Sequence, residues 1–273
     1  MQGDTEDLIH LVSFPDGLES GEDRVKPGKR SETCVLADQT IGWALELAEK
    51  KGIKRAAFCS AAAAMLVQGF SIPKLIEDGI IDKEGIPTKM QTIMLSPTMP
   101  AINTAQLVWA CLGNMNSQKL FFSLMVKNSQ SMKLTDWLLC NSAYELEPGA
   151  FNLAPHIIPI GPLVASNRLG DSVGSFWQEA LTCLEWLDQQ PPQSVIFSCF
   201  FYICDIWKVG LGFNKDGNGI ITRGEIKNKV DQLLSYEEFK ATPLELKKTV
   251  VNSIKEGGSS YQNFKKFIEW IKA

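Results

Sequence analysis

A carboxylate at the end of a short apolar run is the first candidate for chemistry in this sequence. The run Cys34-Val-Leu-Ala-Asp38 is typical of a buried strand, and a helical pattern begins at Ile41. In open α/β sheets, ligands bind beside the carboxyl ends of the strands. A carboxylate there can orient and stabilise a histidine that acts as a general base. It can equally cap the helix that follows, and the spacing alone favours neither interpretation of Asp38.

The two histidines offer no clear base. His10 lies within an apolar run, Leu8-Ile-His10-Leu-Val, and His156 follows Pro155 at the start of another. Both contexts favour a hydrogen-bonded histidine inside the fold over an exposed catalytic base. The sequence contains no GxGxxG, Walker A, GxSxG or HExxH motif. No complete catalytic set is therefore visible from motifs alone.

Residues 214–225 have the spacing of an EF-hand calcium loop. The oxygen ligands would come from Asn214, Asp216, Asn218, the backbone carbonyl of Ile220, and Glu225. The first ligand is an amide rather than a carboxylate, glycines stand where an entering helix should end, and no second copy occurs. A polar turn is the favoured interpretation, with Thr222 and the Glu three residues later forming a capping box at the start of a helix.

Short apolar runs alternate with helical patterns along the chain. We expect strands at 8–14, 34–37, 55–59, 137–140, 157–160 and 195–200, and helices at 41–50, 176–189 and through much of 103–133. Short links from strand to helix to strand predict parallel pairing with right-handed crossovers, and thus an α/β fold with a doubly wound sheet. Two later apolar stripes are expected to pack into a core: Ile226, Val230, Leu233 and Leu234, and Tyr261, Phe264, Ile268 and Ile271.

Composition excludes several classes of protein. The 273 residues are 45% apolar and 21% charged, as in globular proteins rather than disordered chains. A net charge of −4 gives no field that would attract nucleic acid or an anionic membrane. Seven widely spaced cysteines without a CxxC pair favour reduced thiols and a cytoplasmic protein. The longest apolar stretches, 56–67 and 195–204, fall short of the roughly 20 residues that span a bilayer. We expect a monomer with no tightly bound cofactor.

An ordered set of segments resembles the plant family 1 UDP-dependent glycosyltransferases. The segments are IHLVSFPDGL (9–18), CVLAD (34–38), GWALELAE (42–49), NSAYELE (141–147), PIGPL (159–163), CLEWLDQQP (183–191), GLG (210–212), RGEI (223–226) and GGSS (257–260). Each is moderately specific, but together they cover nearly the whole chain in the family's order.

This resemblance implies a GT-B-like fold, in which two Rossmann-like domains face each other across a cleft. The N-terminal domain would hold a small hydrophobic acceptor (phenolic, flavonoid-like or hormone-like), and the C-terminal domain would hold a UDP-sugar, with UDP-glucose the expected donor. In the family, a histidine deprotonates the acceptor hydroxyl, an aspartate supports that histidine, and the sugar is transferred with inversion. Asp38 matches the supporting aspartate, and Phe58 and Ser60 would lie near the acceptor pocket.

The sequence also departs from the family pattern. The loop that bears the family's catalytic histidine has no counterpart, and the long donor-binding box expected between Val195 and Tyr202 is missing. We therefore expect an acceptor domain without its first strand (1–163), a linker and helix (164–190) and a remnant donor domain (191–273), whose helices pack on the acceptor domain. The predicted result is a family member that transfers no sugar. The alternatives are a non-catalytic small-molecule binding module and a calcium-binding protein.

Overall fold

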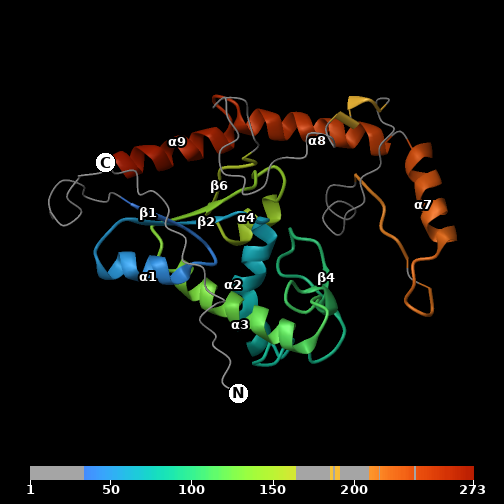
Figure 1. Ribbon diagram of the computed structural model, residues 1–273, viewed down its shortest axis with the longest axis horizontal. Helices are drawn as coiled ribbons and strands as arrows, with labels where there is room; N and C mark the ends of the chain where they lie inside the picture. Colours follow the sequence, from blue (N-terminus) through green and yellow to red (C-terminus); the bar gives the residue numbers. More distant parts are fainter. Residues whose placement is uncertain (1–33, 164–184, 187, 191–208, 215, 237) are drawn as a thin grey trace, which may run out of the picture. The chain divides into compact units, whose positions relative to one another are not determined.

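The structure is a computed structural model of the chain and describes residues 34–163, 185–186, 188–190, 209–214, 216–236 and 238–273 (Figure 1). These residues all lie in one compact unit, Thr33–Ala273. The strands are β1 (Val35–Asp38), β2 (Arg55–Cys59), β3 (Thr92–Ile93), β4 (Ile102–Asn103), β5 (Trp137–Cys140) and β6 (Ile157–Pro159). The helices are α1 (Gly42–Lys50), α2 (Ala63–Glu77), the short 3-10 helix η2 (Thr104–Gln106), α3 (Met115–Met132), α4 (Pro148–Leu153), α7 (Arg223–Ser235), α8 (Glu238–Ile254) and α9 (Ser259–Lys272). Within the described residues, no helix is long and apolar enough to cross a membrane.

Four parallel strands form the main sheet in the order β1-β2-β5-β6, and β3 pairs with β4 separately in an antiparallel arrangement. The strands expected at 55–59 and 137–140 are confirmed to the residue, and those expected at 34–37 and 157–160 differ by one residue at their ends. The helix expected at 41–50 begins one residue later. The strands expected at 8–14 and 195–200, and most of the helix expected at 176–189, lie outside the described residues.

Side chains alternate between the two faces of the sheet, and each face has its own apolar cluster. On one face, residues such as Ala57 and Leu138 pack with Leu45 of α1 and with side chains of α2 and α4. On the other face, Ala56 and Leu139 pack with Phe267 of α9. Because successive strand residues point to opposite sides, neighbouring residues of β2 and β5 serve both clusters. The sheet is therefore covered on both faces, as the doubly wound prediction requires.

Helix α9 docks on the sheet through aromatic and polar contacts. The ring of Trp137 in β5 lies 5.6 Å from that of Phe267 and 6.0 Å from that of Trp270. Lys54 Nζ donates a 2.9 Å hydrogen bond to the carbonyl of Trp270, and Asn263 Nδ2 donates one of the same length to the carbonyl of a β6 residue. The expectation that C-terminal helices pack on the acceptor domain is confirmed for α9.

The apolar stripe expected on α9 was only partly correct. Phe267, which the stripe left out, is 2% exposed, whereas Phe264, which it included, is 42% exposed; Ile268 and Ile271 do pack against the cluster. The two phenylalanines lie on adjacent sides of the helix, and the sequence pattern does not show which side meets Trp137.

The stripe expected on α7 is not a core stripe. No residue of α7 is buried, and Ile226 and Leu234 are 43% and 52% exposed. The prediction of core packing was wrong here because the described residues hold no second parallel sheet for the helix to cover.

Helices α2 and α3 pack against each other beside the sheet (Figure 1). Gly69 of α2 permits the close approach, since a Cβ there would lie 2.9 Å from Ser129 Oγ and 3.3 Å from Met125 Cε of α3. This contact matters for function, because a hollow lies on each side of it and both are lined by Gly69 and Ser129.

Candidate functional site

The carboxyl ends of the main strands meet at one edge of the sheet. All four strands run parallel, so Asp38, Cys59, Cys140 and Pro159 end them on the same side. That edge is where ligands bind in open α/β sheets. The predicted place of Asp38, at the end of a parallel strand, is confirmed.

Asp38 closes a tight turn and does not cap the helix that follows. Its Oδ1 accepts hydrogen bonds from the backbone N–H of Thr40 at 2.9 Å and from Thr40 Oγ1 at 2.6 Å. Helix α1 has Ile41 at its N-cap and no side-chain cap, so the interpretation of Asp38 as the helix cap was wrong. Its second oxygen, Oδ2, accepts no hydrogen bond from any described residue. Within the described part of the chain, one oxygen of this half-buried carboxylate is therefore left to accept a hydrogen bond at the edge.

A groove of about 170 Å³ lies directly beside this turn. It is lined by Gln39 and Thr40 after β1, by Met65, Leu66 and Gly69 of α2, and by Phe121, Leu124, Met125, Asn128, Ser129 and Met132 of α3. The volume is close to that of a cavity of about 150 Å³ that holds benzene in another protein. The groove can therefore take one aromatic ring of a ligand, with the polar side chains at its rim near Asp38 available to a hydroxyl.

The sequence placed two other residues near an acceptor pocket, and neither lines this groove. Phe58 is half-buried and packs on the α9 face of the sheet with the cluster that contains Phe267. Ser60 is exposed just beyond the end of β2. The lining that sequence reasoning missed comes from α3, where Phe121, Leu124 and Met125 have the i, i+3, i+4 spacing of one helix face.

Glu147, the last residue of the NSAYELE segment, fixes the helix that forms one wall of the groove. It is 3% exposed, and its two carboxylate oxygens accept 2.9 Å hydrogen bonds from the backbone N–H groups of Ala63 and Ala64. These groups lie at the N-terminus of α2, where unpaired N–H donors and the helix dipole favour a negative charge. Sequence reasoning used this glutamate only as a family marker and missed its structural role.

Two buried cysteines lie side by side at the ends of β2 and β5. Cys59 and Cys140 are paired in register, and both Sγ atoms lie 3.4 Å from the carbonyl oxygen of Ala61, to which they donate. The contact with Cys59 and then burial raise the pKa of Cys140. That thiol therefore stays protonated at neutral pH and provides no nucleophile. Burial of the cysteines holds for Cys59 and Cys140, whereas Cys111 is exposed.

Among the described residues, His156 is the one histidine, and it lies at the wrong edge of the sheet to assist Asp38. It directly precedes β6, at the amino end of the strand, and is exposed. Its ring packs against that of Phe70 with 5.1 Å between centroids, and partial burial lowers its pKa. The expectation of a hydrogen-bonded interior histidine was wrong for His156, because the residue stands before the strand rather than in it. His10 lies outside the described residues.

The EF-hand-like segment is closed by hydrogen bonds among its own residues. Asp216 Oδ1 accepts from two backbone N–H groups of the loop at 2.9 Å, one of them that of Ile220. Thr222 caps α7 as expected, since its Oγ1 accepts from the N–H of Glu225 at 3.1 Å. Glu225 does not return the second bond of a capping box and instead accepts from the N–H of Asn214 at 2.9 Å. In the described part of the chain, no group of three or more His, Cys, Asp or Glu side chains is arranged to hold a metal ion.

A larger cavity of about 490 Å³ lies near the opposite edge of the sheet, at the residues that precede β5 and β6. Volume alone would make it the leading candidate for a ligand site. We place the candidate acceptor site at the smaller groove because Gln39 and Thr40, the two residues that follow Asp38, line it.

Comparisons with known proteins agree with the resemblance found in the sequence. The chain matches no protein-family model. It is 35% identical to UDP-glycosyltransferase 83A1 of Arabidopsis thaliana over 98% of this chain and 85% of that protein. It is 30% identical to mogroside I-A1 synthase of Siraitia grosvenorii over 70% of this chain, but spans only 44% of that relative.

Solved structures show the same fold at low sequence identity. A UDP-glucosyltransferase from Polygonum tinctorium, described as capable of glucosylating indoxyl, aligns over 88% of this chain and 76% of its own with a TM-score of 0.66 and 16% identity. UGT2 of Phytolacca americana, complexed with UDP-2-fluoro-glucose and pterostilbene, aligns over 88% and 77% with a TM-score of 0.68 and 14% identity. The predicted GT-B-like α/β fold is confirmed.

The alignment with the Arabidopsis protein also shows large internal gaps. It extends over 393 positions, whereas this chain has 273 residues, so at least 120 aligned positions carry no residue of this chain. The predicted internal shortening is thus confirmed by a relative that the chain otherwise matches nearly from end to end. The match to that relative, over most of both chains and with the fold in agreement, shows that this chain belongs to the plant UDP-glycosyltransferases.

Proposed function

We propose that this chain binds a small hydrophobic acceptor beside Asp38 but transfers no sugar to it. The acceptor would be a phenolic, flavonoid-like or hormone-like molecule, with one ring in the groove between α2 and α3. The groove next to the Asp38 turn is the observation that carries the proposal. Asp38 is the ancestral supporting aspartate in this account, and its Oδ2 would accept a hydrogen bond from the acceptor hydroxyl.

The lack of transfer is inferred from the internal gaps. In the family, a long segment at this place binds the uracil, ribose, diphosphate and sugar of the donor, whereas here the sequence passes from Val195 to Tyr202 without such a segment. UDP-glucose is the donor expected from the family. A diphosphate needs backbone N–H groups or cations to hold it, and the shortened segment leaves few residues to provide them.

The domain limits expected from the sequence match a chain that keeps acceptor binding and has lost donor binding. Residues 1–163 would form the acceptor domain, 164–190 a linker and helix, and 191–273 what remains of the donor domain. The docking of α9 on the acceptor sheet supports a surviving role for the last part as a cover of that sheet.

Acceptor binding can be tested by titrating the chain with a panel of simple phenols and flavonoids and measuring the dissociation constants. Leu124 lines the groove, and a charged side chain there would be buried against the ligand. We expect Leu124→Arg to weaken binding by about tenfold or more. Leu120→Arg, on the same helix at a 65% exposed position outside the groove, is the matched control and should change affinity less than about twofold.

Two results would contradict the acceptor site: no saturable binding by any member of the panel, or equal losses in the Leu124 and Leu120 variants. The donor is tested separately by calorimetry with UDP-glucose. We expect no saturable heat, and micromolar binding of UDP-glucose would overturn the proposed loss of the donor site.

A further inference from the structure

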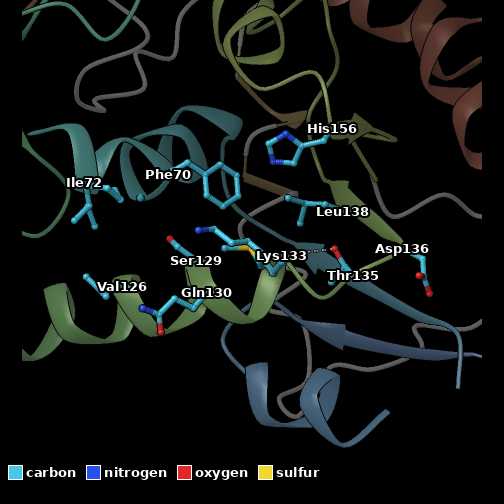
Figure 2. A pocket seen from close by; sticks show the side chains of 13 residues that line it. Phe70, Ile72, Val126, Ser129, Gln130, Lys133, Thr135, Asp136, Leu138 and His156 are labelled. Carbon is cyan, nitrogen blue, oxygen red and sulfur yellow. Dashed lines mark hydrogen bonds between the residues drawn. The ribbon is translucent and has the colours of Figure 1, made fainter. Parts of the chain in front are cut away.

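The larger cavity has the properties of a second ligand site. It lies between α2, α3 and the residues that precede β5 and β6, and its volume of about 490 Å³ is within the 300–1,000 Å³ of small-molecule sites (Figure 2). Gly69, Ser129 and Met132 line both this cavity and the acceptor groove, so the close α2–α3 contact separates the two hollows. A ligand here would lie away from Asp38 and the carboxyl ends of the strands.

One wall of the cavity is aromatic. The rings of Phe70 and His156 lie 5.1 Å apart with 45° between their planes, and Figure 2 shows both beside the side chain of Leu138. Neither ring is fully covered by the protein: Phe70 is half-buried and His156 is exposed. Aromatic faces left open in an apolar hollow favour a planar aromatic ligand, which can stack on them at little conformational cost.

The lining carries one lysine and one aspartate, so the directions of these two side chains decide which ligand the cavity suits. Lys133 is the lysine among the described lining residues, and Figure 2 shows its side chain extending into the hollow on the side of Phe70 and Ser129. Asp136 is the acidic lining residue, and it is engaged elsewhere, because its Oδ2 accepts a 2.9 Å hydrogen bond from the N–H of Arg55. Partial burial lowers the pKa of His156 and so favours its neutral form, which leaves Lys133 as the cationic group of the lining.

The end of α3 does not oppose an anion at this place. Helix C-termini carry partial negative charge on their last carbonyls. Here the carbonyl of Met132 accepts from Thr135 Oγ1 at 2.8 Å, and the carbonyls of Gln130 and Ser131 accept from the N–H of Lys133. These bonds pair the last carbonyls of α3, and the ammonium of Lys133 is the cationic group among the lining residues.

We propose that this cavity binds a planar aromatic molecule bearing one carboxylate, with the ring against Phe70 and His156 and the carboxylate at Lys133. The site is separate from the acceptor groove, so either can fail without the other.

Calorimetry with 2-naphthoate and its neutral analogue 2-naphthamide tests this site on the full chain. We expect saturable binding of both and tighter binding of the naphthoate. Lys133→Gln should weaken naphthoate binding by about three- to tenfold and leave naphthamide within about twofold, as expected for a solvent-accessible ion pair. Lys127→Gln is the matched control, because Lys127 is exposed on the same helix and lines neither hollow.

Phe70→Leu should weaken both probes, since it removes the ring against which they stack. Leu124→Arg should leave both unchanged, since Leu124 lines only the acceptor groove. The proposal is overturned if naphthoate shows no saturable binding, if the two lysine variants behave alike, if Phe70→Leu has no effect, or if Leu124→Arg abolishes binding.

Discussion

At the residue scale, two carboxylates hold the carboxyl edge of the sheet by accepting hydrogen bonds. Asp38 takes both donors of Thr40, and Glu147 takes the N–H groups of Ala63 and Ala64. The sequence predicted the position of Asp38 because a strand end is a local feature. It could not predict that Glu147 caps α2. The N–H groups that donate to Glu147 lie more than 80 residues away in the chain, and only the fold brings them together.

Replacing Glu147 by Gln should destabilise the protein by about 1–3 kcal/mol. The amide oxygen can accept from one of the two backbone N–H groups, but the amide NH₂ would then face the other N–H, and two donors cannot bond to each other. Urea denaturation measures the loss. Glu49→Gln is the control, since the 46% exposed side chain of Glu49 makes a 3.5 Å ion pair with Arg55, and the change should cost less than about 1 kcal/mol. A Glu147 variant as stable as the control would refute the capping role.

His156 gives a pH dependence with a definite sign. Partial burial lowers its pKa in the folded state, so the unfolded chain binds a proton at a higher pH than the native protein. Stability should therefore be undiminished above the ordinary histidine pKa of about 6.5 and should fall as the pH drops below it.

The check is the melting temperature at pH 7.5 and pH 5.5 for the natural chain and for His156→Gln. The variant should lose less over this interval, because its side chain does not titrate. An equal or larger loss in the variant would show that burial of His156 does not oppose its protonation.

At the scale of elements, α9 shows where sequence patterns stop being sufficient. The helix itself follows from its apolar periodicity, and Ile268 and Ile271 pack as expected, but the pattern chose Phe264 in place of the buried Phe267. The deciding factor is Trp137, whose ring lies 5.6 Å from Phe267. The parallel strands were predictable because a short, fully apolar run such as 137–140 is hard to interpret as anything except a buried strand.

Phe267 and Phe264 together provide a direct test of the packing of α9 on the sheet. Phe267→Ala should cost about 3–5 kcal/mol, since it removes a buried ring from the cluster on the sheet. Phe264→Ala, three residues away and 42% exposed, should cost no more than about 0.5 kcal/mol. Denaturant unfolding of the two variants is the measurement, and similar losses in both would mean that α9 does not pack as described.

At the scale of the whole molecule, this chain is a shortened member of its family. The family was recognisable from sequence because its marker segments survive in order. The groove was not, because most of its lining comes from α2 and α3, two helices far apart in the chain that approach closely at Gly69. At least 120 of the 393 aligned positions carry no residue of this chain, and the described residues hold no second parallel sheet that α7 could cover.

The most direct test is to incubate the chain with UDP-glucose and the phenol it binds most tightly, and to look for the glucoside by mass spectrometry. The account predicts that the phenol is recovered unchanged, although the protein binds it. Glucoside accumulating over several turnovers per protein molecule would contradict the account.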